Sequence, residues 1–181
     1  MRYLVITAAG AVLLGLSGHA GAESPWVLQA GAGVGVHRTH ADYPDAPPPS
    51  FSIGPGVQID AGYRVHSIAA VGLHLGAQVI EAPRHLAINS FEDRTYVGIE
   101  AGVSGSVVLD RVTLSPWLGL QSLHGKRYRA VGLTAAYDVR IFDHERIALF
   151  ASVIVNNDLL AGDNWPISDV GALVGVGYRY W

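Results

Sequence analysis

Apolar residues alternate with small or polar residues along most of this chain, and this period of two constrains the fold more than any other feature. From Ile53 to Val65 every second residue is apolar, while Gln58, Asp60 and Arg64 lie at positions between them. Successive side chains of a β-strand point to opposite faces, so the pattern predicts a strand with one apolar face. Half of the residues are hydrophobic and only 15% are charged, fewer charges than an ordinary water-exposed surface carries. The sequence therefore predicts strands that present their apolar faces to lipid, as in a membrane β-barrel.

Eight segments are predicted as strands: 26–37, 53–65, 69–79, 96–109, 112–121, 131–141, 147–156 and 171–180. The segment 147–156 is apolar on both faces, so its register stays open, whereas no charged residue falls on the apolar face of the other seven. Pro116 lacks a backbone donor, which predicts a bulge or irregularity in the fifth strand. The predicted fold class is all-β: an eight-stranded antiparallel up-and-down transmembrane β-barrel.

The residues between the apolar positions are mostly Gly, Ala and Ser, with isolated charges. A soluble β-sandwich or lipocalin-like barrel has the same alternation with its apolar face inside, so a soluble periplasmic barrel is an alternative. Small residues and a few paired charges suit a narrow lumen better than a solvated surface. We therefore favour the membrane barrel, with a lumen filled by side chains.

The connections between these segments alternate in length. Short turns are expected around 66–67, 110–111 and 143–146, and longer polar or Pro-rich connections at 39–52, 81–93, 124–129 and 157–169. Short turns at one end and long loops at the other are typical of outer-membrane barrels, whose turns face the periplasm. The pattern predicts that the long connections lie outside the cell.

The first 22 residues have the pattern of a secretory signal peptide. Arg2 precedes an apolar run from Leu4 to Leu16, which is followed by Ala20, Gly21 and Ala22. The run is shorter than the ~20 residues that a membrane-spanning helix needs, so a membrane anchor is the weaker interpretation. We predict a cleaved signal peptide at 1–22 and one barrel domain at 23–181.

From Trp26 to Trp181 the chain resembles the small eight-stranded outer-membrane β-barrel proteins of Gram-negative-type envelopes. The resemblance depends on the signal peptide, the alternation, the rhythm of short and long connections and the aromatic C-terminal residue Trp181. It implies an integral, multi-pass protein of the outer membrane, with outer-membrane lipid and the barrel-assembly machinery as partners. In that family the machinery reads a terminal aromatic residue with apolar residues at alternate preceding positions. Here Arg179 shares the parity of Trp181, whereas Tyr178 and Tyr180 belong to the apolar set.

Isolated charged residues on the polar faces are candidates for a lumen charge network. Buried ions are costly unless paired, so we expect salt bridges and hydrogen bonds among them, with an ion-conducting or gating path as the alternative. The candidates are Asp60, Arg64, Glu100, Asp138, Arg140 and Arg179.

Aromatic residues on the apolar faces are candidates for a belt at the membrane interface, where an apolar ring with a polar edge is favoured. With the N-terminus on the periplasmic side, those near the periplasmic rim are Trp26, Tyr63, Tyr137, Tyr178 and Tyr180.

Two weaker patterns resemble chemical sites. Ser122 and His124 lie two positions apart on one strand face, and some outer-membrane deacylases of lipid A pair a His and a Ser with a carboxylate; here the order is reversed and no lipid-facing carboxylate accompanies them. His37, His40 and Asp42 could clasp a divalent metal, but a Pro-rich loop holds metal ligands poorly. We therefore predict no catalytic residues, no metal site and no cofactor.

The expected function is a structural or surface-interaction role of a barrel without catalysis. The connections 39–52, 81–93 and 157–169 would contact a surface ligand, because loops on a rigid scaffold carry variable polar chemistry. A lipid A-modifying hydrolase that uses Ser122 and His124 and a small ion or solute pore are the alternatives. The net charge of −3 and the lack of a basic stripe exclude nucleic acid as a partner.

Overall fold

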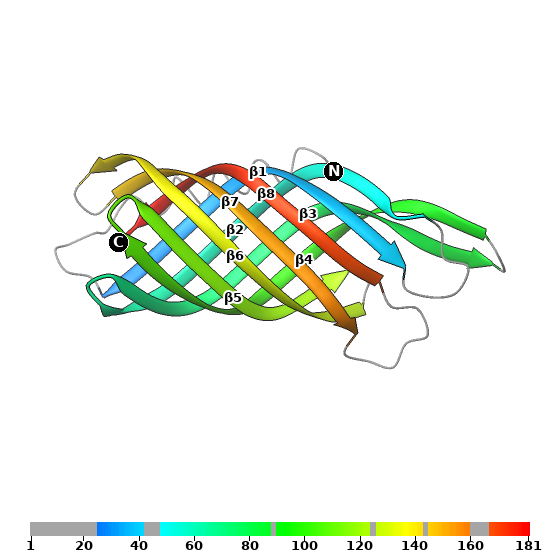
Figure 1. Cartoon of the computed structure of the whole chain (residues 1–181), viewed down its shortest axis with the longest axis horizontal. Coiled ribbons are helices and arrows are strands. Elements are labelled where there is room, and N and C mark those ends of the chain that lie inside the picture. The colour runs from blue at the N-terminus through cyan, green and yellow to red at the C-terminus, as the bar shows by residue number, and fades with distance from the viewer. Residues whose placement is uncertain (1–24, 42–47, 88–89, 124–125, 143–144, 160–166) are drawn as a thin grey trace.

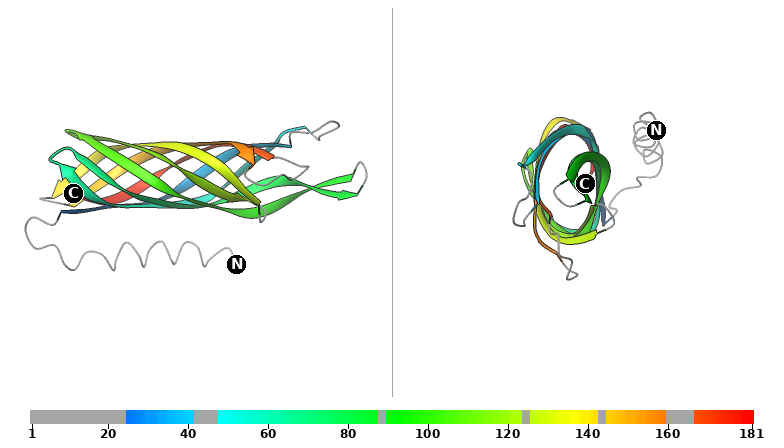
Figure 2. Two further views of the ribbon diagram at one scale, coloured as in Figure 1. Left: turned by 90° about the horizontal axis from the view of Figure 1, so that it is seen from below. Right: turned by 90° about the vertical axis from the view of Figure 1, so that its right-hand side faces the viewer.

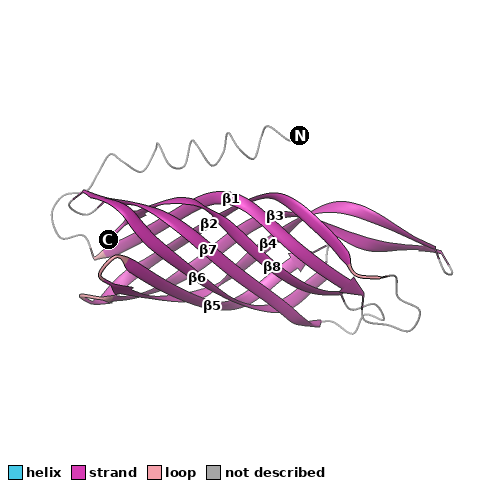
Figure 3. Ribbon diagram, turned by 45° about the horizontal axis from the view of Figure 1, so that its top comes forward, coloured by secondary structure: helices cyan, strands magenta, loops and turns pink. Residues whose placement is uncertain are grey.

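Eight antiparallel strands form a closed barrel in which each strand pairs with the next and β8 pairs with β1 (Figures 1 and 3). The structure is a computed structural model that describes residues 25–41, 48–87, 90–123, 126–142, 145–159 and 167–181. The strands are β1 (Trp26–Ala41), β2 (Ser50–His66), β3 (Ala69–Ala87), β4 (Ser90–Leu109), β5 (Val112–Leu123), β6 (Lys126–Phe142), β7 (Glu145–Leu159) and β8 (Ile167–Tyr180). Within the described part of the chain, no helix has the length and apolarity to cross a membrane. The predicted fold class is confirmed, whereas the predicted signal peptide lies outside the described residues.

The apolar faces of the strands form the outside of the barrel. Leu73, Leu118 and Val174, for example, are exposed on β3, β5 and β8, while the residues beside them in sequence point inward. On β7 the neighbouring strands decide the register that the sequence left open. Leu149 pairs with outward-facing residues of β6 and β8 and is itself exposed, so Phe150 points into the barrel. Closure satisfies the backbone polar groups of the wall, which an apolar environment demands.

The two ends of the barrel differ. One end, called the turn end below, holds the C-terminus, the start of β1 and the short connections of β2 to β3, β4 to β5 and β6 to β7 (Figure 1). In the turn of β4 to β5, Asp110 has a φ of 56°, a left-handed conformation that Asp tolerates better than most residues. The opposite end, called the loop end, holds the other four connections.

The prediction of long loops at this end is partly wrong. Most of the segment 81–93 belongs to strands, because β3 continues to Ala87 and β4 begins at Ser90. These two strands form a hairpin that projects beyond the rest of the barrel (Figures 1 and 2). The segment 126–129 also belongs to a strand, β6. Pro and charged residues favoured loops locally, but pairing with the neighbouring strand prevails over that local preference.

Pro116 interrupts a ladder without forming a bulge. The pairs Ser104 with Trp117 and Val107 with Leu114 follow the same register of β4 and β5 on either side of the interruption. On its other edge Pro116 keeps its place opposite Leu133 in the ladder of β5 and β6. The missing donor of Pro116 therefore loosens one ladder and leaves the strand in register.

Apolar clusters fill the interior at several levels. Ile80, Leu123 and Tyr128 are fully buried together near the loop end. Further clusters lie between the two ends, one around Trp117 and Ile154 and one around Phe150 and Leu173. At the turn end, Trp181 packs with Ala70 and Val108. These clusters place apolar side chains at several levels of the narrow interior that eight strands enclose.

Two glycines allow a very close approach of β1 and β8. Gly33 pairs with Gly175, and a Cβ at Gly33 would lie 2.0 Å from the carbonyl oxygen of Val174. A Cβ at Gly175 would lie 2.1 Å from the carbonyl oxygen of Ala32. Only glycine fits these two positions.

The barrel as a whole has an oval cross-section (Figure 2).

Candidate functional site: the polar interior

The inward faces of β1, β3, β4 and β8 carry a chain of hydrogen-bonded polar side chains. Nδ1 of His37 lies 3.2 Å from both carboxylate oxygens of Asp169, and its Nε2 lies 2.7 Å from Oε1 of Gln78. The amide of Gln78 then donates to Glu100 at 2.9 Å. All four side chains are buried, so the chain links β8 to β4 across the interior.

A second histidine extends this chain to β2. Nδ1 of His74 lies 2.9 Å from Asp60, and its Nε2 lies 3.6 Å from Oε2 of Glu100. The imidazole also stacks on Trp117, with 4.3 Å between ring centroids and 11° between planes. Asp60 therefore hydrogen-bonds Nδ1 of the imidazole, Glu100 lies close to Nε2 without a hydrogen bond, and the stacked ring of Trp117 fixes the orientation of the imidazole.

Asp169 anchors a third set of contacts. Gln121 donates to its Oδ2 at 3.0 Å, and the backbone N–H of Asp169 donates to Oδ1 of Asn156 at 2.7 Å. Asn156 in turn donates to Oε1 of Gln121. These three residues come from β8, β5 and β7, so the polar contacts involve residues of every strand except β6.

A separate ionic cluster lies nearer the turn end. Asp138 of β6 accepts hydrogen bonds from Arg179 of β8 and, at 2.8 Å, from Arg146 of β7. Arg146 also donates to the backbone carbonyl of Asp110. Asp138 and Arg179 are almost inaccessible to solvent, at 0% and 2%. Such a pair in a low-dielectric interior needs the additional hydrogen bonds that Arg146 supplies.

Four of the six predicted lumen charges lie buried inside the barrel: Asp60, Glu100, Asp138 and Arg179. Arg64 is half-buried at the turn end, where its guanidinium lies 5.5 Å from the ring centroid of Trp181.

Arg140 is exposed and lies over the ring of Phe142 at 4.5 Å, so its prediction as a lumen residue is wrong. The register of β6 against β7 shifts between Asp138 and Arg140. That irregularity reverses the alternation and turns Arg140 outward.

The five predicted interface aromatics lie on the outward faces of their strands. Trp26, Tyr63 and Tyr137 are exposed, and Tyr178 and Tyr180 are half-exposed. Trp26 and Tyr63 form an edge-to-face pair with 5.6 Å between centroids. All five positions lie towards the turn end.

The sequence does not decide whether the side chain of Trp181 faces into the barrel or away from it. In the structure it turns inward and is only 8% exposed. Its indole N–H donates to the carbonyl oxygen of Ser67 in the turn of β2 to β3, at 3.3 Å. The C-terminal residue therefore lies across the mouth of the barrel at the turn end.

The weaker chemical patterns do not form sites in the described part of the chain. Ser122 is half-buried on β5, next in sequence to the buried, inward-facing Gln121 and Leu123, and His124 lies outside the described residues. His37 is committed to Asp169 and Gln78, while Asp42 lies outside the described residues. Among residues with described positions, no group of three or more His, Asp or Glu side chains is arranged to hold a metal ion.

Sequence reasoning missed much of the polar interior. The sequence pattern places Asp169 in a loop and offers His37 only as a metal ligand, and it does not indicate Gln78, Gln121 and Asn156 as partners. The sequence does place these residues at the alternate positions that face inward. Buried amides and imidazoles usually have hydrogen-bond partners, so their positions indicated that such partners exist. The partners themselves lie on strands far apart in sequence.

At the level of sequence, no family model matches the chain, and a search of curated proteins finds no significant match. Among solved structures, the chain is similar to Neisserial surface protein A, NspA, with 14% identity and a TM-score of 0.54 over 87% of this chain and 97% of that one. It is also similar to Ail, the attachment invasion locus protein of Yersinia pestis, with 12% identity and a TM-score of 0.56 over 87% of this chain and 100% of that one. The chain has the fold of a small outer-membrane β-barrel protein. This fold and the apolar exterior are those of integral outer-membrane proteins.

Proposed function

We propose that this protein is a structural or surface-interaction barrel that contacts a ligand outside the cell through its loop end. The turn end, with its aromatic belt, would face the periplasm, and the polar interior would hold the barrel rigid. The proposal includes no catalytic step. Outer-membrane lipid surrounds the apolar exterior in this proposal, and the assembly machinery inserts the chain.

The projecting hairpin of β3 and β4 carries the proposal. The ladder of β2 and β3 ends at Gln78, and the ladder of β4 and β5 ends at Ile99. Beyond these positions β3 and β4 continue to pair with each other as far as Ala87 and Ser90. This two-stranded ribbon is longer than a connection between neighbouring strands requires, and projecting strands are common binding elements.

A solved structure of Ail is of a complex with a heparin analogue, sucrose octasulfate. For the present chain, the proposal extends only to an extracellular surface ligand. The exposed arginines Arg127 and Arg129 at the loop end of β6 are compatible with an anionic ligand.

The alternatives have less support. A lipid A hydrolase would need an oriented Ser and His pair, and Ser122 has no such partner among the residues that the structure describes. A pore would need an open lumen, whereas apolar clusters fill the interior at both ends.

Hairpin removal tests the proposal. Residues 81–95 are replaced by Asn-Gly, which joins the paired residues Ile80 and Tyr96 through a two-residue turn. Bacteria that display this variant should lose adhesion to cultured epithelial cells, while the barrel still shows heat-modifiable migration on a denaturing gel. The control is Arg140→Gln, an exposed substitution at the turn end, which should leave adhesion unchanged. Equal adhesion of intact wild type and of the hairpin variant would contradict the proposal.

A further inference from the structure

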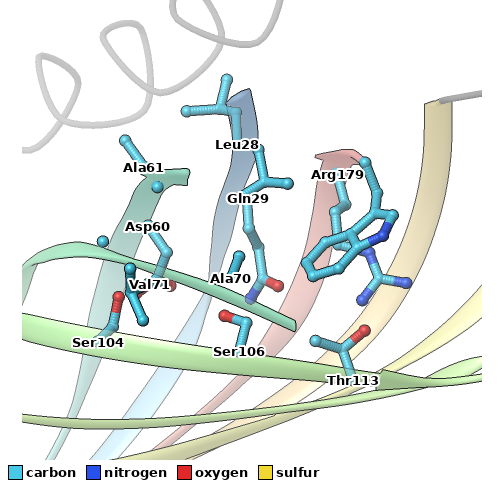
Figure 4. A pocket seen from close by; sticks show the side chains of 14 residues that line it. Leu28, Gln29, Asp60, Ala61, Ala70, Val71, Ser104, Ser106, Thr113 and Arg179 are labelled. Atoms are coloured by element: carbon cyan, nitrogen blue, oxygen red, sulfur yellow. The ribbon is translucent and has the colours of Figure 1, made fainter. Parts of the chain in front are cut away.

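A small cavity lies inside the barrel, beneath Trp181 at the turn end (Figure 4). Its volume is about 20 Å³, and its lining comes from six strands and Trp181. Six polar side chains line it: Ser104 and Ser106 of β4, and four that are more deeply buried, Gln29 of β1, Asp60 of β2, Thr113 of β5 and Arg179 of β8. Each of the four is more than nine-tenths buried. The cavity therefore lies between the barrel wall and Trp181, with these polar side chains in its lining.

Three of these residues form a row across neighbouring strands. Gln29 pairs with Asp60 in the ladder of β1 and β2, and with Arg179 in the ladder of β1 and β8. All three face inward, so the carboxylate and the guanidinium lie on either side of the amide. Side chains directly opposite each other begin only about 4.5–5.5 Å apart. Their polar groups therefore share one region without direct bonds between Asp60 and Arg179.

Each of the four side chains has a polar atom without a hydrogen-bond partner within the described protein. These atoms are Nε2 of Gln29, Oδ2 of Asp60, Oγ1 of Thr113, and Nε and Nη1 of Arg179. A buried polar group without a partner is strongly unfavourable, so such groups usually bind ordered water. The set contains donors and an anionic acceptor around one space.

We propose that this cavity is a binding site for one or two water molecules that connect Asp60 to Arg179. A buried water needs roughly 10–15 Å³ of space open to a water-sized sphere and two to four polar partners. The cavity has room for that and no more. An anion in the same space would meet the carboxylate of Asp60, and a cation would meet the guanidinium of Arg179. Water matches both because it donates and accepts hydrogen bonds.

The bound water completes a single polar network through the barrel. Asp60 belongs to the chain that continues through His74 and Glu100, and Arg179 belongs to the cluster with Asp138. Trp181 covers this site, because it lines the cavity and its indole is bonded to Ser67.

Nuclear magnetic resonance of the full mature chain, refolded in lipid nanodiscs, tests the site. We expect dipolar cross-peaks between water and two groups, Hε of Arg179 and the side-chain amide of Gln29. In rotating-frame spectra these cross-peaks should have the sign opposite to that of cross-peaks from proton exchange. A wild-type protein without these cross-peaks would overturn the proposal. If the chemical shift of Hε of Arg179 changes with added sodium bromide and the change saturates, the cavity binds an anion. That result would also overturn the proposal.

Matched variants locate the water. Thr113→Val removes one polar partner and should reduce the cross-peak at Hε of Arg179 at least twofold. Thr134→Val is the control, because Thr134 is also buried but donates to Ser152 at 3.0 Å, and it should leave the cross-peak unchanged. Heat-modifiable migration verifies that both variants fold. Equal reductions in the two folded variants would contradict the assignment of water to this cavity.

Discussion

At the scale of single residues, Asp138 and Arg140 are only two positions apart on β6 but lie in different environments. Asp138 is buried and bonded to Arg179 and Arg146, whereas Arg140 is exposed over Phe142. The register shift between them separates the two environments. Whether a charged side chain of β6 is buried or exposed therefore depends on how its strand pairs with β7 at that point, and not only on its position in the sequence.

The Asp138 cluster leads to a stability prediction. Asp138→Asn leaves two arginines without their carboxylate, and loss of one partner of a buried ion pair costs about 3–5 kcal/mol. We expect a decrease of this size in the free energy of unfolding, measured by urea titration in lipid vesicles. Arg140→Gln is the matched control and should change that free energy by less than about 0.5 kcal/mol. Comparable losses for both variants would show that Arg140 belongs to the interior network.

At the scale of strands and hairpins, the spacing of β1 and β8 depends on paired glycines. Gly33 and Gly175 lie opposite each other on the inward faces of the two strands that close the barrel. By contrast, a Cβ at Gly105 of β4 would meet no heavy atom nearer than the carbonyl oxygen of Ala70, at 3.9 Å. Glycines within strands of one barrel therefore differ in how strictly they are required.

Alanine substitutions test this difference. Gly33→Ala places a Cβ against the carbonyl of Val174, so we expect overpacking that destabilises the barrel by about 1–3 kcal/mol or more. The fraction of protein that refolds in detergent, read as heat-modifiable migration, should decrease. Gly105→Ala should refold like the wild type. If Gly33→Ala refolds equally well, the close approach of β1 and β8 is not required for closure.

At the scale of the whole molecule, closure and filling act together. The ladder of β1 and β8 removes the open edges of the sheet within the wall, and apolar clusters occupy the interior near both ends. A closed wall resists unfolding in detergent because all of its strands must separate together. We expect that an interior with these clusters gives no continuous path for ions.

Two measurements on the refolded wild type follow from this architecture. We expect faster migration of the unheated sample than of the boiled sample on a denaturing gel. In planar bilayers the same preparation should give no single-channel currents over a wide range of voltages. Stepwise currents from heat-modifiable protein would contradict a filled lumen and would revive the pore alternative.

Much of the architecture was predictable from the sequence because its signal is local. The period of two, the small residues between apolar positions and the spacing of the turns predicted eight strands and an apolar exterior. These features depend on residues one or two positions apart, which a strand places on fixed faces. The burial of Asp60, Glu100, Asp138 and Arg179 followed from parity alone.

The tertiary structure decided which inward residues meet. His37 with Asp169, His74 with Asp60 and Gln29 beside Arg179 are contacts between strands whose register and closure no local pattern specifies. The outward turn of Arg140 depends on a register shift, and the inward position of Trp181 depends on the turn of β2 to β3 that accepts its hydrogen bond. The sequence by itself determined a membrane barrel and the two faces of most strands, because alternation is a property of neighbouring residues. Only the closed structure decided the polar network, because its partners are brought together by the pairing of strands around the barrel.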